Sequence, residues 1–464
     1  MNTTILVLVL AIYFLGMIGI GLLGRKKYGQ SFEALITAGR NVGVLMFAGS
    51  AIGAHIGNGF VVGGAADGAA LGISGVWYGI ACALSYLVVA FLMNKRIYQK
   101  GFITLPDFLQ ERYHDKTTSL IFSLATTIGY IGFVGVQIMA GKALFTALGL
   151  DGNLGAIIIT LVVLAYSTLS GLWGAYATSV VQVAIITVGL IITSIILLAK
   201  GGVSTISSAI ASGALPMGFQ DILPEGIGPI LMMFIPITMG VMADQCTIQR
   251  VNSSKSEKTA MRGWILSVVL MLPLALMPAF IGMYGAAAFA ASGNGAFFVV
   301  IMETLHPVVA AVMIAAVLAA IMSTCDSLLV GFSTVLLHDI YRGMINPKAT
   351  DKALTVADRV ITAVAAGFAL LIALVATNIV DLLILCDVFI ASCIFVPFIG
   401  GLFWKGGTRK GAVGASIVGL IVVLLNLTQI LPLPYSEVTP TVCSLIAYIA
   451  ISLATKETKL EARA

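Results

Sequence analysis

Long apolar segments set the strongest limit on how this chain can fold. From Thr4 to residue 455, thirteen stretches of roughly 20 residues each carry few or no charges. Such a stretch can cross the hydrocarbon core of a bilayer as a helix, which satisfies its own backbone hydrogen bonds there. Only 10% of the 464 residues are charged, against roughly 25% in a soluble domain. The alternating segments of a membrane barrel are missing, so the sequence predicts an all-α polytopic membrane protein.

We number the expected spans 0 to 12. They lie at about residues 4–23, 42–63, 72–94, 118–147, 154–172, 175–199, 227–249, 263–287, 307–337, 360–379, 381–404, 411–430 and 440–455. Span 0 is not expected to be a cleaved signal peptide, because its basic residues, beginning at Arg25, follow the apolar run instead of preceding it.

The distribution of Lys and Arg predicts the orientation. Of the 25 basic residues, 23 fall in one alternating set of loops, and only Lys142 and Lys200 fall on the other side. Loops rich in Lys and Arg stay in the cytoplasm. We therefore expect a multi-pass protein of the plasma (inner) membrane, with its N-terminus outside and its C-terminus in the cytoplasm.

No soluble domain is expected, because the stretches between spans are short. The chain has no nucleotide-binding P-loop, so ATP bound by this chain is not its energy source. Neither the four histidines nor the six cysteines have metal-ligand spacing. We expect no enzyme activity and no nucleic-acid partner. The oligomeric state is open, and a monomer is expected to be functional.

Two spans carry the residues that interrupt helices. Span 1 has four glycines between Gly49 and Phe60, around His55 and Asn58. Each glycine costs a helix about 1 kcal/mol, so this stretch is expected to unwind and to expose carbonyls that can bind a cation. Close packing of small residues is the alternative. Span 6 has Pro229, Pro236 and Gly240 before Asp244, and its position five spans later predicts an inverted repeat of five plus five helices.

Span 8 carries a stripe of small and hydroxyl-bearing residues. Ala320, Ser323, Thr324 and Ser327 follow the i, i+3, i+4, i+7 pattern and so share one helix face. Oxygen ligands suit a hard cation such as sodium. Hydrogen bonding between helices is the alternative role for such hydroxyls.

Several short motifs occur in order along nearly the whole chain. They are Ala38-Gly39-Arg40, Thr104 to Leu109 with Arg112-Tyr113, Ile248-Gln249-Arg250, and Pro397 to Trp404 with Lys405, Gly411 and Ala412. Together, on thirteen spans, they resemble the sodium:solute symporter family, whose members carry sugars, proline, pantothenate or sialic acid.

The resemblance implies a leucine-transporter-like fold with alternating access driven by the sodium gradient. It divides the chain into span 0 with its turn (1–41), a first repeat (42–200), an extracellular connection (201–226), a second repeat (227–404) and spans 11 and 12 with a cytoplasmic tail (405–464). The main sodium site of the family then falls on the carbonyls of Gly53, Ile56 and Ala320 and on the hydroxyls of Ser323 and Thr324.

Some family members have a second sodium site between spans 5 and 8. The matching positions here are Ser179, where an Asp is usual, and Asp326 with Ser327. The carboxylate has therefore moved across the interface. The resemblance implies a second sodium or proton site at these three residues.

The resemblance implies that the solute binds beside spans 1, 2, 3, 6, 7 and 10. The candidates are polar or aromatic: His55, Asn58, Phe60, Trp77, Tyr78, Gln137 and Asp244, with Asp387 as a further buried acid. No span has an Arg near its middle, so we expect none in the pocket. Asp244 suggests an amino acid or other amine-bearing solute, unless it pairs with Gln249 or Arg250 at the cytoplasmic end.

We thus expect a sodium-coupled symporter that imports a small polar organic solute. The main alternative is a proton-coupled or mixed sodium/proton symporter of another solute class, such as a sugar or organic acid, because His55 and Asp326 can titrate. A channel or receptor could share the composition, but two broken helices around an oxygen-lined site favour a carrier.

Overall fold

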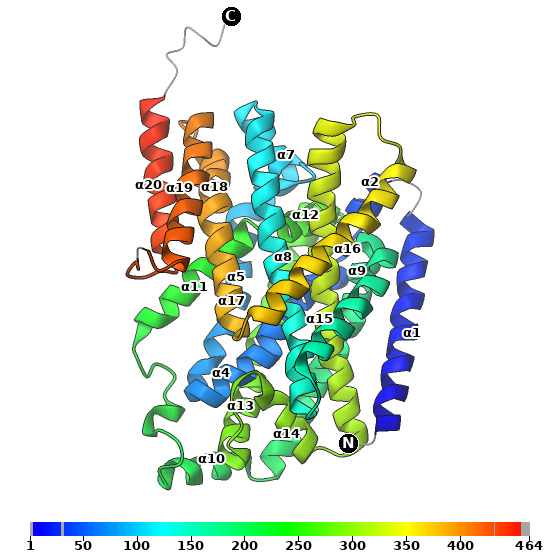
Figure 1. Ribbon diagram of the computed structural model, residues 1–464, viewed down its shortest axis with the longest axis vertical. Coiled ribbons are helices and arrows are strands. Elements are labelled where there is room, and N and C mark those ends of the chain that lie inside the picture. Colours follow the sequence, from blue (N-terminus) through cyan, green and yellow to red (C-terminus); the bar gives the residue numbers. More distant parts are fainter. Residues whose placement is uncertain (1–2, 29–31, 431, 456–464) are drawn as a thin grey trace, which may run out of the picture.

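A computed structural model describes residues 3–28, 32–430 and 432–455 (Figure 1). Its regular elements are helices, and no strand forms within these ranges, which confirms the all-α prediction. Eight helical segments there are long and apolar enough to cross a membrane, and a bent pair makes a ninth. The count of thirteen spans remains a prediction.

The helices follow one another with short links. Those of the N-terminal part are α1 (Thr3–Tyr28), α2 (Phe32–Thr37), α3 (Val44–His55), α4 (Gly64–Leu71), α5 (Trp77–Val88), α6 (Asn94–Lys100), α7 (Leu105–Tyr113), α8 (Lys116–Ala147), α9 (Gly152–Ala199) and α10 (Gly202–Ala211). Those of the C-terminal part are α11 (Ile227–Met242), α12 (Gln245–Ser253), α13 (Glu257–Phe289), α14 (Ala296–Thr304), α15 (Pro307–Thr334), α16 (Asp351–Val375), α17 (Ile379–Ile390), α18 (Val396–Phe403), α19 (Arg409–Leu427) and α20 (Thr439–Ala454).

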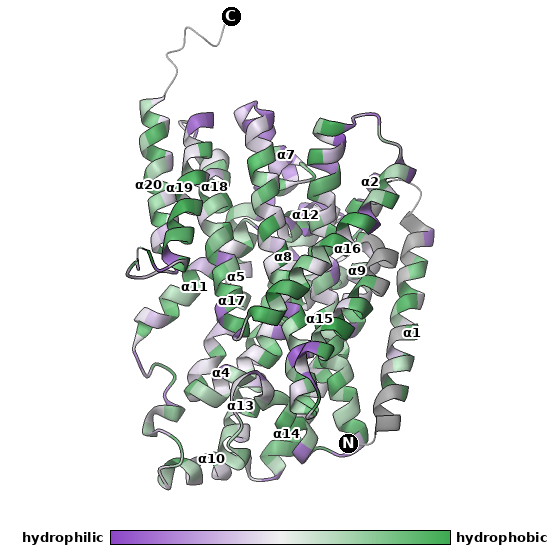
Figure 2. Cartoon of the chain, in the orientation of Figure 1, coloured by the Kyte–Doolittle hydropathy of each residue, from purple (hydrophilic) through white to green (hydrophobic). Residues whose placement is uncertain are grey.

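Apolar side chains cover the sides of the helix bundle. Figure 2 shows hydrophobic colours along most of the helices, with the hydrophilic colours at their upper ends and in several connecting loops. Leu15, Phe91 and Val375 are 70%, 69% and 80% exposed, which suits contact with lipid chains and not with water. The first described residues of α1 and the end of α20 lie at opposite ends of the molecule (Figure 1).

Helix α15 lies at the centre of the bundle. In its most apolar stretch 83% of the residues are buried, compared with 28% for α16. It packs against α1, α3, α8 and α9. Alanines such as Ala316 and Ala319 are fully buried on it, and such small side chains let neighbouring backbones come close. The hydroxyl stripe of the sequence is therefore inside the protein and not at its lipid surface.

The helical path is interrupted at two places near the middle of the molecule. Helix α3 ends at His55, and after the turn Ile56–Gly57 the chain continues as a π-helical turn, Gly59–Gly63, and α4. Helices α11 and α12 meet at 49°. Pro236 stays inside α11, and the bend comes at Ala243 and Asp244, where the Asp244 side chain caps α12.

One expected boundary between spans does not coincide with a helix end. Spans 4 and 5 were expected at 154–172 and 175–199, but α9 runs through both, from Gly152 to Ala199. The side chains at 165–171 lie outside the described set. Because Gly174 carries helical backbone hydrogen bonding like any other residue, a single glycine here is not enough to end the helix.

Candidate functional site

A cavity lies between the two interrupted helices. Its wall is formed by α3 and the turn after it, α5, α8, α11, α12, α15 and α17. The polar and titratable residues that line it are His55, Tyr78, Cys82, Tyr130, Gln137, Asp244, Cys246, Arg250, Thr324, Ser327 and Asp387. Polar groups at this depth are costly unless they have a partner, so this cavity is the candidate binding site.

Four of the seven solute candidates line the cavity, namely His55, Tyr78, Gln137 and Asp244. The other three have structural contacts elsewhere. Asn58 is fully buried and donates through Nδ2 to the Val136 carbonyl at 2.6 Å. Phe60 is 2% exposed, against Gly79 of α5. The Trp77 indole donates to the Ile222 carbonyl at 2.7 Å, in the connection before α11.

Asn58 and Gln137 together hold the turn of span 1 in place. The Asn58 backbone N–H donates to Gln137 Oε1 at 3.0 Å. This bond satisfies a backbone donor at the point where the helix is interrupted. It also fixes the Gln137 amide so that its oxygen is engaged and its nitrogen is the group left for the cavity.

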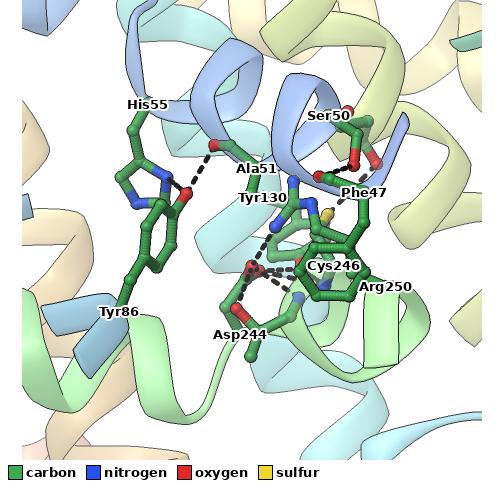
Figure 3. A network of polar contacts seen from close by, with 11 residues as sticks. Phe47, Ser50, Ala51, His55, Tyr86, Tyr130, Asp244, Cys246 and Arg250 are labelled. Carbon is green, nitrogen blue, oxygen red and sulfur yellow. Dashed lines mark hydrogen bonds and ion pairs between the residues drawn. The ribbon is translucent and has the colours of Figure 1, made fainter. Parts of the chain in front are cut away.

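Asp244 is occupied as the N-cap of α12. Its carboxylate accepts from the backbone N–H of Cys246 at 3.2 Å and of Thr247 at 3.0 Å, and the Tyr130 hydroxyl also donates to it (Figure 3). The Arg250 Nη1 lies 3.8 Å from Asp244 Oδ2. The alternative role for Asp244, a pair with Arg250, therefore matches the geometry, and little of this carboxylate is left for a solute amine.

The expectation that no arginine lies in the pocket is wrong. Arg250 lines the cavity and is fully buried, and none of its three guanidinium nitrogens has a hydrogen-bond partner among the described residues. The charge count placed Arg250 in a cytoplasmic loop. Side chains on a helix lean toward its N-terminus, so Arg250 of α12 reaches back to the bend. The sequence contains one signal for this pair: an acid at the N-cap of a helix, followed six residues later by an Arg.

Asp387 of α17 is the acid that remains available. It lines the cavity, is 8% exposed, and makes no hydrogen bond or ion pair that the described residues reveal. A methyl group built on Gly240 of α11 would overlap its carboxylate. The absence of a side chain at Gly240 therefore makes room for Asp387. A carboxylate held in this way can take a cation or a hydrogen-bond donor from a solute.

Hydroxyl and carbonyl oxygens converge beside the end of α3. The hydroxyls of Ser323 and Thr324 lie 2.8 and 3.0 Å from the Gly53 carbonyl oxygen, and 2.9 and 3.1 Å from that of Ala320. Each hydroxyl can donate its proton to one carbonyl and still offer a lone pair to a cation. Ile56, the next expected ligand, lies fully buried in the turn after α3. This all-oxygen set fits the chemistry of sodium.

The three residues of the expected second site do not all face the same way. Ser179 of α9 is close to the oxygen cluster, because a methyl group on Gly53 would lie 3.1 Å from Ser179 Cβ and 3.4 Å from Ser323 Oγ. Ser327 lines the cavity. Asp326 is fully buried outside the cavity lining, within electrostatic reach of Tyr13 of α1. Adjacent helix residues point about 100° apart, which separates Asp326 from Ser327.

Sequence comparisons identify relatives over most of the chain. A model of the sodium:solute symporter family matches residues 35–419. A sodium/proline symporter of Staphylococcus aureus (strain JH9) is 28% identical over 454 residues, covering 92% of this chain and 87% of that protein.

Solved structures with a similar fold are transporters. A substrate-bound, outward-open Na⁺-coupled sialic acid symporter aligns with a TM-score of 0.82 at 18% identity, covering 97% of this chain and 98% of that one. MhsT in complex with L-phenylalanine aligns with a TM-score of 0.55 at 15% identity, covering 89% and 99%. These neighbours have the leucine-transporter fold, which confirms that part of the fold prediction.

The Asp244–Arg250 pair leads to a stability prediction. Replacing one partner, as in Asp244→Ala, should destabilise the protein strongly, because breaking a buried pair costs about 3–5 kcal/mol. The double variant Asp244→Ala/Arg250→Met should lose less than the sum of the two single changes, by about 0.5–3 kcal/mol if the residues are coupled. The unfolding midpoints of the four purified proteins measure this.

The exposed pair Arg409–Asp115, at 3.0 Å with the Arg side chain 56% exposed, is the control. Its double-variant cycle should show at most about 1 kcal/mol of coupling. Additive losses for Asp244 and Arg250 would contradict the assignment of the pair.

Proposed function

Because the chain belongs to the sodium:solute symporter family, we propose that it imports a small polar solute bearing an amine, together with sodium, by alternating access. Sodium is the coupling ion of this family. We further propose that residues 42–200 and 227–404 are the two halves that move against each other, and that the N-terminus lies outside and the C-terminus in the cytoplasm.

We place the main sodium site at Gly53, Ile56, Ala320, Ser323 and Thr324. The supporting observation is that two hydroxyls of α15 each lie within 3.0 Å of the same carbonyl oxygen of α3, across the helix interface. Bound sodium would join α3, at its interrupted end, to the central helix α15. A sodium ion that joins these two helices can favour one arrangement of the halves over the other, which is how ion binding becomes coupled to solute binding.

The solute class follows from the charges that line the cavity. Asp244 and Arg250 compensate each other at 3.8 Å, whereas Asp387 has no cationic partner among the described residues. When Asp387 is ionised, one negative charge remains in the cavity, and a positively charged amine would balance it. Arg250 and the Gln137 amide nitrogen could receive the carboxylate of an amino acid. The observation that supports an amine-bearing solute is that Asp387 lines the cavity and has no cationic partner among the described residues.

The residues Ser179, Asp326 and Ser327 are proposed as a second cation or proton site. Ser179 lies beside the main site, and Asp326 is the carboxylate one turn along α15. A fully buried carboxylate at this depth is expected to be balanced by a cation or a proton. A coupling proton carried by Asp326 would therefore bind at the same place as a second sodium ion.

Removing the two hydroxyls should remove the effect of sodium on stability. Sodium should raise the unfolding midpoint of the wild-type protein, since a ligand that binds only the folded state stabilises it. The variant Ser323→Ala/Thr324→Ala should lose most of that increase. Thr126→Ala removes a buried hydroxyl that bonds only to its own helix, at the Phe122 carbonyl, and should keep it. An unchanged sodium response in the double variant would show that the ion binds elsewhere.

Neutralising Asp387 should weaken binding of cationic solutes. Amino acids, amines, sugars and organic acids would first be screened by sodium-dependent uptake into vesicles. For an amine that is taken up, Asp387→Asn should raise KM roughly 10- to 100-fold, the loss expected for a charge-assisted hydrogen bond. Asp381→Asn, an exposed acid in the first turn of the same helix, is the matched control. Uptake of only neutral or anionic solutes would contradict the amine proposal while leaving sodium coupling intact.

The Asp326→Asn variant separates the three roles of that residue. If a second sodium binds there, the Hill coefficient for sodium should fall while the main site still works. If Asp326 carries a proton, transport of the wild-type protein should depend on pH and that dependence should disappear in the variant. Wild-type sodium and pH dependence in the Asn variant would mean that Asp326 has a structural role.

A further inference from the structure

One hydroxyl group determines how His55 faces the cavity. His55 is the last residue of α3, and its Nδ1 lies 2.5 Å from the Tyr86 hydroxyl oxygen of α5. The same hydroxyl lies 2.5 Å from the Ala51 carbonyl oxygen, one turn earlier on α3 (Figure 3). Tyr86 is fully buried against Trp264, with ring centroids 4.7 Å apart. The hydroxyl therefore has a fixed place between two partners.

The number of protons in this contact fixes the tautomer of His55. A tyrosine hydroxyl has one proton, and a carbonyl oxygen can only accept. The Tyr86 proton must therefore go to Ala51. The bond between Tyr86 and His55 then needs its proton from Nδ1. In the neutral ring this leaves Nε2 without a proton, so Nε2 is an acceptor.

The acceptor nitrogen lies on the edge of the ring opposite Tyr86. The two rings meet edge to face, with centroids 5.0 Å apart and planes at 84°. His55 lines the cavity, and no hydrogen bond to Nε2 is found among the described residues. Tyr86 is thus a positioning residue, and Nε2 is the atom that remains for a molecule in the cavity.

We propose that His55 selects the solute by accepting a hydrogen bond at Nε2 from one of its N–H or O–H groups. This inference rests on the proposed function and deepens it. Asp387 attracts a positive charge of any kind, whereas an unprotonated Nε2 needs a donor. Asp387 and His55 together therefore distinguish a protonated amine from a quaternary ammonium of the same charge. The quaternary ammonium has no N–H group, and a buried acceptor that is left without a donor costs binding free energy.

The tautomer can be measured without knowing the solute. Full-length protein labelled with ¹⁵N-histidine would be studied by NMR in lipid vesicles containing sodium, with His55→Gln identifying the signal. A protonated Nδ1 and an unprotonated Nε2 are expected. In Tyr86→Phe, which removes only the hydroxyl, the Nδ1–H form should lose its preference. A protonated Nε2 in the wild-type protein, or no change in Tyr86→Phe, would overturn the proposal.

The acceptor role can be measured by chemical protection. Diethylpyrocarbonate modifies unprotonated histidine nitrogens, and mass spectrometry would locate the modification. Methylammonium, the smallest solute with both the charge and N–H groups, should slow modification of His55 at least severalfold. Tetramethylammonium, which has the charge without N–H groups, should not. Equal protection by both ions, or by neither, would overturn the proposal.

Two controls keep this result separate from the proposed function. His114 and His306, which do not line the cavity, are the internal reference: methylamine itself consumes diethylpyrocarbonate, so the modification of His55 is measured relative to that of these two residues. The stabilisation by sodium should persist in His55→Gln and Tyr86→Phe, because neither residue belongs to the oxygen cluster. If sodium does not stabilise the wild-type protein at all, that result would instead contradict sodium coupling.

Discussion

Backbone groups that leave a helix inside a bilayer must find another partner, because no water is present to bind them. The central part of this protein depends on how that requirement is met. The N–H groups at the start of α12 are bound by Asp244, and the N–H of Asn58 is bound by Gln137. The Gly53 carbonyl receives the hydroxyls of Ser323 and Thr324. Three of the side chains that bind these backbone groups, Asp244, Gln137 and Thr324, also line the candidate site.

The charges in the cavity follow from the same requirement. Asp244 is needed as a cap for α12, and a buried carboxylate needs a positive neighbour. Arg250 supplies it from the same helix at 3.8 Å. This pair accounts for two of the three formal charges that line the cavity and leaves Asp387, opposite Gly240, as the third. Because Asp244 and Arg250 neutralise each other, Asp387 is the charged group that a solute in the cavity can pair with.

Helix α12, the second half of the bent pair, is also joined to the segment that precedes α7. Gln245 accepts from the Leu105 N–H at 2.8 Å and donates to the Ile103 carbonyl at 3.1 Å, and Asn252 donates to the Phe102 carbonyl at 2.5 Å. The segment before α7 is thus bound to α12 along its length. These three hydrogen bonds connect the helix that follows the bend at Asp244 to the loop at 102–105.

The sequence by itself determined the membrane-spanning helical fold, the family and the i, i+3, i+4, i+7 stripe on α15, because these depend on apolar length and on helical period. The glycines of span 1 indicated the turn after α3, because glycine acts locally, whereas Pro236 stays inside α11 and the bend follows it at Ala243 and Asp244. Only the tertiary structure decided which polar side chains share the cavity. Asn58 and Trp77 have partners far away in sequence, and no local pattern shows that they are already engaged. Arg250 was counted as a loop residue because a charge count assigns a side chain to the position of its Cα. Its long side chain, leaning toward the start of α12, instead reaches the bend, and that contact exists only once the helix is folded and packed.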